Sequence, residues 1–429
     1  MKRKLLVVVL DGADIGLLKN WSAQGLLPNL KKIMDQNNLI ELGNYPIYRN
    51  EAPWESMLTG CFPEQTGYWT AIQFISETYK MKFGGAYPYE QFRPFYALAE
   101  KSSCTVFDLP HTGRLFPGLS GIQVLGWGAH YPLCKGISDP PELYRELTDK
   151  FGEHDAMKIQ NKGSWWDSDF LYLIRSKLFE GIQKSGELHR YLLKTYPADL
   201  TILSFSEIHT AGHHFWHLTD KNHPLYGKNT QVIPDFLKEM YIRTDRELGY
   251  LIDSVSDSTD ILILSPMGGA SNWYATNSKV FLPELLFRWN FPGKKLFSDT
   301  DKYGDHSPVI PDQNHWVKAV WEDYYRNLPP GWIPRFLHPL FRRMAAVRRI
   351  QYPFYGARLL GQLQWQPAAW YSPWWHKMKA FSIPGQGDGY IRINLKGREK
   401  RGIVNPRDMN RICDELTGKL IELRNPLTG

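Results

Sequence analysis

Residues 4–14 read KLLVVVLDGAD, and this stretch decides the class of fold. An unbroken apolar run that ends in a polar turn is typical of a strand buried on both faces, as in a parallel sheet. The run stops at Asp11, which places a carboxylate at the carboxyl edge of the sheet, where open α/β sheets bind their ligands. An Asp-Gly pair after a strand is also a common turn, and that interpretation stays open.

Further short apolar segments alternate with longer stretches of helical periodicity along the chain. The expected strands are 4–10, 39–42, 105–109, 123–126, 200–205, 260–264 and 390–395. The expected helices are 17–36, 141–151, 167–196, 234–255 and 406–423. This alternation predicts an α/β fold, a three-layer α/β/α sandwich with a mostly parallel central sheet.

The regular alternation fails between residues 292 and 375, where Pro, Trp, Arg and Tyr are frequent. We therefore predict a core of residues 1–291, an irregular insertion or cap of residues 292–375, and a C-terminal strand and helix, residues 376–429, that return to the core. Within the insertion, residues 336–350 combine arginine with apolar side chains. This segment predicts either a basic helix packed on its own domain or peripheral contact with an anionic membrane surface.

The composition excludes several classes of protein. Of the 429 residues, 43% are hydrophobic and 22% are charged, which is typical of a globular protein and not of a disordered one. The net charge of +7 is modest for this length, so it predicts no nucleic-acid partner and suits a small anionic substrate. The four cysteines form no CxxC pair and the first apolar run is too short for a signal peptide, so we expect a cytoplasmic protein.

A second strand end is followed by a concentration of histidines. Residues 201–217 read TILSFSEIHTAGHHFWH, in which His209 and His213 are four residues apart. If a helix begins near Glu207, these two imidazoles lie on one of its faces, as two ligands of one divalent metal would. His214 then points to a different side of the helix.

Several segments together resemble the type I phosphodiesterase/nucleotide pyrophosphatase branch of the alkaline phosphatase superfamily. They are LDGADIGLLKNWSAQGLLPNLKKIM (10–34), PWESMLTGCFPEQTG (53–67), VFDLPHTGRLFPG (106–118), GIQVLGWGAHYP (121–132) and YIRINLKGREKRGIVNP (390–406). The resemblance implies an alkaline phosphatase-like fold and a hydrolase of phosphoric ester or anhydride bonds that uses two divalent metals, usually zinc. Asp11 matches the metal-binding aspartate of that pattern.

The chain departs from the pattern of this branch at its chemical positions. The Thr or Ser nucleophile would fall at or next to Asn50, whose side chain cannot form a phosphoryl intermediate. Where the branch has an Asp followed four residues later by a His, this chain has His209 and His213. Where the branch reads Asp-His-Gly, this chain reads PMG at 266–268, and its Pro-x-x-His-Gly turn is PEQTG at 63–67.

These departures predict a reduced metal site with one ion, zinc being the first candidate, and a lost second site. Water on that ion could attack phosphorus directly. The predicted site residues are, for catalysis, Asn50, Glu51 and Glu207, for the metal, Asp11, His209 and His213, and for substrate binding, Trp54 and His214.

Two functions follow from the resemblance. The first is a metal-dependent hydrolase or transferase acting on a phosphorylated small molecule, such as a nucleotide sugar or glycan precursor. The alternative is a catalytically inactive or repurposed member that binds a phosphorylated ligand or a partner, which the loss of the Asp-His pair favours. Neither function indicates an oligomeric state.

Overall fold

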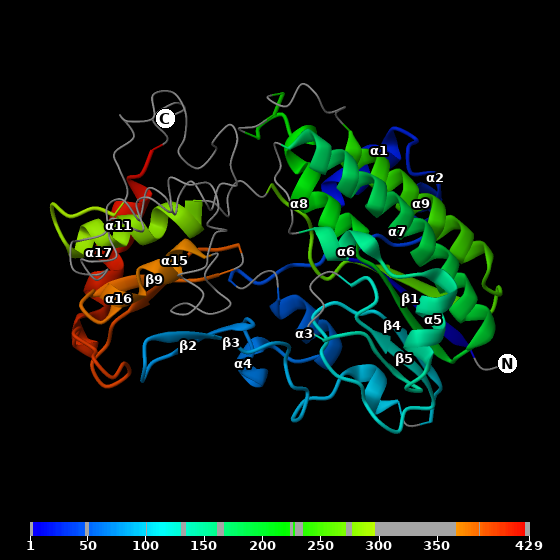
Figure 1. The fold of residues 1–429 in the computed structure, drawn as a ribbon, viewed down its shortest axis with the longest axis horizontal. Coiled ribbons are helices and arrows are strands. Elements are labelled where there is room, and N and C mark those ends of the chain that lie inside the picture. The colour runs from blue at the N-terminus through cyan, green and yellow to red at the C-terminus, as the bar shows by residue number, and fades with distance from the viewer. Residues whose placement is uncertain are drawn as a thin grey trace, which may run out of the picture. The chain divides into compact units, whose positions relative to one another are not determined.

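The computed structural model describes residues 3–47, 51–99, 101–129, 134–160, 167–223, 226–227, 235–271, 277–296, 366–385 and 387–424. Contacts divide the chain into two compact units, both visible in Figure 1. Unit 1 comprises Met1–Ala71 and Gly85–Trp273, and unit 2 comprises Ile72–Gly84 and Tyr274–Gly429.

Unit 1 is built around a six-stranded sheet with the order β6-β5-β4-β7-β1-β8. Its strands are β1 (Lys4–Leu10), β4 (Cys104–Phe107), β5 (Gly121–Leu125), β6 (Ile137–Asp139), β7 (Leu200–Phe205) and β8 (Thr259–Leu264). Neighbouring strands are parallel except β5 and β6, which are antiparallel. The predicted α/β fold with a mostly parallel central sheet is therefore confirmed.

Strand β1 shows why the sheet is covered on both faces. Alternate side chains of a strand point to opposite faces of its sheet. Leu6, Val8 and Leu10 belong to one hydrophobic cluster, whereas Val7 and Val9 belong to a second one. The continuous apolar run at the N-terminus thus reflects burial on two sides.

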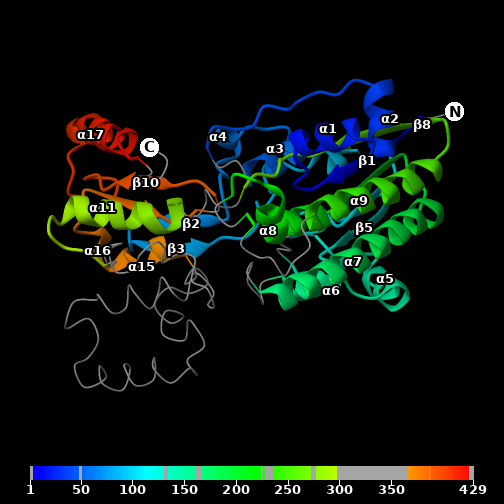
Figure 2. The same ribbon diagram turned by 90° about the horizontal axis from the view of Figure 1, so that it is seen from above.

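Helices supply the outer layers of unit 1. The helices that contribute to the first cluster are α1 (Ile15–Ala23), α2 (Pro28–Gln36), α5 (Leu143–Phe151), α6 (Asp155–Ile159), α7 (Ser168–Thr195), α8 (Glu207–Thr219) and α9 (Phe236–Asp253). Figures 1 and 2 show α7, α8 and α9 side by side. The second cluster is covered by α3 (Ala52–Thr59) and the 3₁₀ helix η1 (Phe95–Leu98). These layers on both faces give the three-layer arrangement.

Two local predictions in unit 1 are wrong. The expected helix 17–36 is two helices, because the chain turns after α1 and Pro28 opens α2. The expected strand 39–42 is not a strand in the structure. Ile40 is 74% exposed, so the apolar character of this segment does not reflect burial in the sheet.

Unit 2 contains two small antiparallel sheets, β2 (Ile72–Ile75) with β3 (Lys80–Phe83) and β9 (Ala380–Ile383) with β10 (Tyr390–Ile393). Its described helices are η2 (Asn277–Phe281), α11 (Leu282–Asn290), α15 (Pro367–Trp370), α16 (Ser372–Trp375), η5 (Pro406–Asp408) and α17 (Met409–Ile421). One hydrophobic cluster includes Leu286, Trp375 and Phe381. The rings of Trp375 and Phe381 stack with their centroids 5.0 Å apart.

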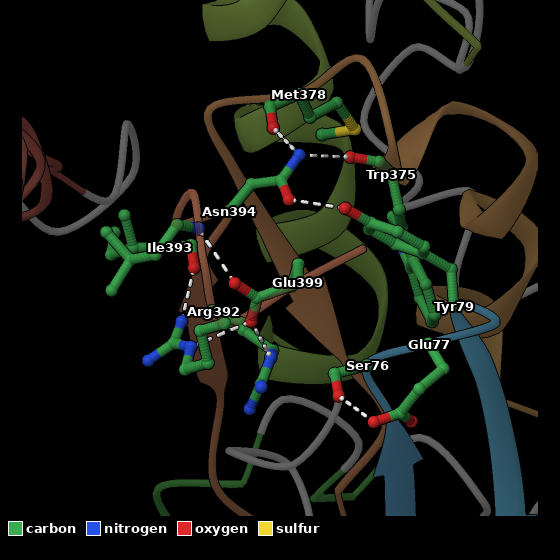
Figure 3. Close-up of polar contacts among 11 residues, drawn as sticks. Ser76, Glu77, Tyr79, Trp375, Met378, Arg392, Ile393, Asn394 and Glu399 are labelled. Atoms are coloured by element: carbon green, nitrogen blue, oxygen red, sulfur yellow. Dashed lines mark hydrogen bonds and ion pairs between the residues drawn. The ribbon is translucent and has the colours of Figure 1, made fainter. Parts of the chain in front are cut away.

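Polar side chains connect the two small sheets of unit 2, as Figure 3 shows. The side-chain oxygen of Asn394 accepts a hydrogen bond from Tyr79 at 2.6 Å, and its amide nitrogen donates to the carbonyl of Trp375 at 3.2 Å. The buried carboxylate of Glu399 pairs with Arg392 at 2.7 Å. The segment 390–406, which supports the family resemblance, therefore serves as structural framework in this unit.

The division of the chain differs from the predicted one. The predicted core 1–291 loses residues 72–84 and 274–291 to unit 2. Residues 376–429, which were predicted to return to the core, belong to unit 2, where β9 and β10 pair with each other. The physical reason is the cluster of unit 2, where these strands bury their side chains against α11 and α17.

The predicted insertion of residues 292–375 lies mainly outside the described residues, since 297–365 are not among them. The basic segment 336–350, for which membrane contact was one alternative, also lies outside them. Among the helices that the structure describes, none combines the length and the apolar character needed to cross a membrane.

Candidate functional site

Three segments of unit 1 follow the carboxyl ends of neighbouring strands. Asp11 directly follows β1, Glu207 begins α8 just after β7, and His111 lies in the loop after β4. Because β4, β7 and β1 are adjacent and parallel, these segments leave the sheet at the same edge. The sheet therefore brings together parts of the chain that are nearly two hundred residues apart.

The central contact of this edge joins Asp11 to His209. Oδ2 of Asp11 lies 3.0 Å from Nδ1 of His209, and Nε2 of His209 lies 3.1 Å from Nε2 of His213. The Asp11 side chain is 0% exposed and that of His209 is 12% exposed, whereas His213 is exposed. The three side chains therefore form a path from the interior to the surface, and the structure brings the three predicted metal ligands together.

Gly12 allows the first strand to approach α8 this closely. Its φ is +71°, in the left-handed region that favours glycine. A Cβ atom at this position would lie 3.0 Å from both Cα and Cβ of His209. A larger residue would therefore push the histidine away from the carboxylate that precedes the glycine.

Asp11 is a buried carboxylate with few polar contacts. Neither of its oxygens has a hydrogen-bond partner with good geometry among the described residues, so the ion-pair contact with His209 is the polar contact that the structure shows for it. A buried carboxylate is costly unless a cation or a donor compensates it. This edge of the sheet therefore favours positive charge.

The Nε2 atoms of His209 and His213 lie at hydrogen-bond distance from each other. Tetrahedral zinc with Zn–N bonds of about 2.0–2.1 Å holds two nitrogens about 3.3 Å apart, and the observed separation is 3.1 Å. Asp11 contacts the other nitrogen of the His209 ring. Across the described part of the chain, no three His, Cys, Asp or Glu side chains are arranged to hold one ion. The residues thus supply two nitrogens, and the direct binding of Asp11 stays a prediction.

His111 was not predicted from the sequence. It is buried, has a φ of +56°, and its ring centroid lies 6.1 Å from that of Trp54. Burial lowers the pKa of His111 to about 4, while the charge of Asp11 raises it and that of His209 lowers it. A neutral imidazole therefore stands near the Asp11–His209 pair. Its position after a strand, within the resembling segment 106–118, was the available signal.

The predicted catalytic residues near α3 are only partly described. Asn50 lies outside the described residues. Glu51 is buried, and its Oε2 accepts a hydrogen bond from the backbone N–H of Ala71 at 2.8 Å. Burial raises the pKa of Glu51, although hydrogen bonds from Thr70 and Ala71 lower it. Trp54 is fully buried, so its ring supports His111 and presents little surface to solvent.

Glu207 and His214 are engaged within the helical layer. The carboxylate of Glu207 lies 3.0 Å from Nε2 of His154 and accepts a hydrogen bond from Ser185 of α7. Burial raises the pKa of Glu207, but the contact and charge of His154, together with hydrogen bonds from Ser185 and from the backbone of Glu207, outweigh burial and lower this pKa. The ring of His214 packs edge-on against Phe170, and burial lowers its pKa to about 4. In this structure both side chains are committed to contacts within that layer.

The described part of the loop after β8, residues 265–271, reaches the same edge of the sheet. A Cβ atom at Gly269 would lie 2.9 Å from the carbonyl oxygen of Gly12. Met267 is buried in the hydrophobic cluster that contains Val9 and Trp54. Apolar packing therefore occupies the loop in which the family pattern has its Asp-His pair.

Comparisons with known proteins agree with the motifs. The model of the family type I phosphodiesterase / nucleotide pyrophosphatase matches residues 5–301. Among solved structures, phosphonoacetate hydrolase from Sinorhizobium meliloti 1021 with phosphonoformate gives a TM-score of 0.39 at 13% identity, covering 62% of this chain and 56% of that chain. The same enzyme with phosphonoacetate gives 0.34 at 14% identity and the same coverages, so each match spans little more than half of the hydrolase. No curated protein matches the chain. The chain belongs to the type I phosphodiesterase/nucleotide pyrophosphatase family.

Proposed function

We propose that this protein is a metal-dependent phosphodiesterase/pyrophosphatase-like hydrolase or transferase. Its substrate is a small anionic phosphorylated molecule, such as a nucleotide sugar or glycan precursor. The observation that carries the proposal is the pair of Nε2 atoms of His209 and His213, 3.1 Å apart at the carboxyl edge of the sheet. Ligands of open α/β sheets bind at this edge, and family membership supports hydrolysis of phosphoester bonds.

His209 and His213 would hold one divalent ion, with zinc as the first candidate. When bound, such an ion acidifies a coordinated water and offsets charge on phosphoryl oxygens. Two protein nitrogens leave coordination positions for solvent and for the substrate. Because Asn50 cannot carry a phosphoryl group, we propose direct attack by water without a covalent intermediate.

Glu51 is the better supported of the two predicted bases. Its Oε2 accepts a hydrogen bond from the Ala71 N–H, while Oε1, like Oε2 of Glu207, has no hydrogen-bond partner among the described residues. Burial raises the pKa of Glu51, whereas the pKa of Glu207 is lowered, and a raised pKa suits a group that takes up a proton during the reaction. Glu207 is bound by His154 and Ser185, so we assign it to positioning α8.

Elemental analysis of the purified full-length chain, followed by hydrolysis of bis(p-nitrophenyl) phosphate, tests the proposal. We expect about one transition metal per chain, because two nitrogens suffice for a single open site. Turnover is lost after chelation, returns with zinc, and is absent in His209→Ala. His376→Ala, which removes a histidine of unit 2, is the matched control and retains metal and turnover. Full turnover in His209→Ala contradicts the proposal.

The second candidate is a non-catalytic member that binds a phosphorylated ligand. The apolar packing of Met267 in the loop of the missing Asp-His pair favours it. This function predicts no bound metal and no turnover, together with saturable binding of a nucleoside diphosphate sugar in calorimetry. Stoichiometric zinc with metal-dependent turnover excludes it.

A further inference from the structure

We propose that Tyr241 of α9 is a positioning residue for Asp11. Its hydroxyl oxygen holds the turn of residues 11–14, which carries Asp11 at the carboxyl edge of the sheet. Tyr241 is not one of the candidate catalytic or binding residues, so it acts through the turn alone. The inference rests on the proposed function and deepens it, because it adds α9 to the elements on which the site depends.

Main-chain hydrogen bonds hold the two ends of this turn. The N–H of Asp11 donates to the carbonyl of Phe205 at 2.9 Å, which continues the parallel pairing of β1 with β7. The N–H of Asp14 donates to the hydroxyl oxygen of Tyr241 at 2.9 Å, and these two residues are 227 positions apart in the sequence. One end of the turn is therefore held by the sheet and the other by α9.

The sequence of the turn explains why it needs a contact from outside. Gly12 has a φ of +71°, and a glycine permits many backbone conformations. Asp14 is the N-cap of α1, and its side chain accepts a hydrogen bond from the Leu17 N–H at 2.8 Å. The N–H of an N-cap residue has no partner within its own helix, so another group has to accept it. The Tyr241 oxygen is that acceptor, and it restricts a turn that glycine would otherwise leave variable.

The ring of Tyr241 is itself fixed by packing. It is 1% exposed and belongs to the hydrophobic cluster that contains Leu6 and Val8. Trp21 of α1 packs edge-on against it, with the ring centroids 4.8 Å apart. Burial also raises the pKa of Tyr241, so the hydroxyl stays neutral. The hydroxyl oxygen therefore has a defined position from which it can hold the turn.

The same turn also packs on α8. A Cβ atom at Gly12 would meet Cα, Cβ and Cγ of His209 within 3.1 Å, so the turn lies directly against this residue. Helices α8 and α9 pack on each other, and Phe215 meets Phe236 edge-on with the ring centroids 5.4 Å apart. The turn is therefore held between two packed helices, and a change at Tyr241 reaches Asp11 through the backbone of a few residues.

Hydrogen exchange of the full-length protein tests the inference independently of activity. In the wild-type protein the Asp14 amide should be protected, because its hydrogen bond has to open before exchange. Tyr241→Phe keeps the ring and removes only the hydroxyl, and it should raise the exchange rate of this amide about 10-fold, the usual order for one lost hydrogen bond. Thr244→Val is the matched control, because it removes a buried hydroxyl of the same helix that donates to the carbonyl of Met240 at 2.9 Å. It should leave the exchange of the Asp14 amide unchanged.

Turnover of bis(p-nitrophenyl) phosphate separates positioning from a loss of stability. At a temperature where both variants stay folded, Tyr241→Phe should lower kcat/KM about 10-fold or more, because small displacements of a catalytic group reduce activity by this order. Thr244→Val should keep the wild-type kcat/KM. Faster exchange of the Asp14 amide together with an unchanged kcat/KM in Tyr241→Phe overturns the inference, since the turn would then not control Asp11.

The failures of the inference and of the proposed function are distinguishable. If the Asp14 amide exchanges at the same rate in Tyr241→Phe and in the wild-type protein, the inference alone fails. If the wild-type protein shows no turnover, the proposed hydrolase function fails, and the exchange rates still decide whether Tyr241 holds the turn. Should Tyr241→Phe not fold, the wild-type protein decides, because an Asp14 amide that exchanges as fast as the amides of the exposed residues 39–42 contradicts the inference.

Discussion

Strands β1, β7 and β8 end at the same edge of one sheet. The residues that follow β1 and β7 include polar side chains, whereas those that follow β8 are mainly apolar. The first two supply Asp11 and His209, which contact each other at 3.0 Å. The loop after β8 supplies Met267, which packs into a hydrophobic cluster. All three strands are parallel neighbours, in the order β7-β1-β8.

One edge of this sheet therefore combines polar contacts with apolar packing. Parallel pairing aligns the strand ends whatever side chains follow them, so the loops can change without a change of fold. The polar half at β1 and β7 carries the contact between Asp11 and His209, and the apolar half at β8 carries the packing of Met267. Substitutions in each half test whether the two have separate roles.

The largest effect is expected from His213→Ala in the polar half. Removing one of two nitrogens should weaken zinc binding by more than about 100-fold, beyond the effect of losing an orienting group, and should abolish turnover. Calorimetric zinc titration measures the change. His214→Ala is the control, because that ring packs against Phe170 and should leave the affinity unchanged. Equal losses in both variants would contradict the assignment of His213.

Glu51→Gln tests the proposed base. It should lower kcat about 100-fold or more, as removal of a general base does, while zinc affinity stays at the wild-type value. Because burial raises the pKa of Glu51 above its ordinary value of 4.5, wild-type turnover should fall as the pH drops through that raised pKa. This acid limb of the pH profile should be missing in Glu51→Gln. If Glu51→Gln keeps the same decrease of turnover at acid pH as the wild-type protein, another residue is the general base.

Met267→Ala tests the apolar half. Its side chain is 8% exposed and belongs to the cluster of Val9 and Trp54. Truncation of a buried Met costs about 2–5 kcal/mol of unfolding free energy, and urea denaturation measures it. Zinc affinity should not change, because this side chain is packing and not a ligand. If Met267→Ala also weakens zinc binding, the polar and apolar halves of the edge depend on each other.

The smallest effect is expected from His189→Leu in the interior. His189 is fully buried between Phe107 and Phe205, and burial lowers its pKa from 6.5 to about 3. Below about pH 6.5 His189 is therefore protonated in the unfolded chain but stays neutral in the folded chain. The free energy of unfolding is highest above that pH and decreases as the pH drops. One such group contributes about 1.4 kcal/mol per pH unit in that window. Urea denaturation at several pH values between 7 and 4 measures this effect. The free energy of unfolding should decrease less steeply with falling pH in His189→Leu than in the wild-type protein.

Much of the framework of unit 1 could be predicted because its signals are local. The structure has β1 at Lys4–Leu10 and β7 at Leu200–Phe205, with the bounds that the apolar runs predicted. Burial on two faces leaves an unbroken apolar run, which is a strong local signal. The segment 39–42 (LIEL) is also mainly apolar, but its Leu and Ile side chains are exposed, so its prediction failed.

The candidate site could be predicted in part. Residues four apart on a helix share a face, which predicted the pairing of His209 with His213. His111 was missed although it follows a predicted strand, because the pairing of β4 with β7, which brings that strand end next to the end of β7, is not visible in the local sequence. The direction of Glu207, towards His154 and Ser185, also depends on how α7 packs against α8.

By itself the sequence determined the strand that ends in Asp11 and the spacing of the two histidines, because strand burial and helix periodicity are properties of consecutive residues. Only the tertiary structure decided which nitrogen of His209 the carboxylate contacts and which loop lost its ligands. Those outcomes depend on the pairing of β1 with β7 and β8 and on the close approach of Gly12 to α8. Such pairings join residues far apart in the chain, and no local pattern specifies them.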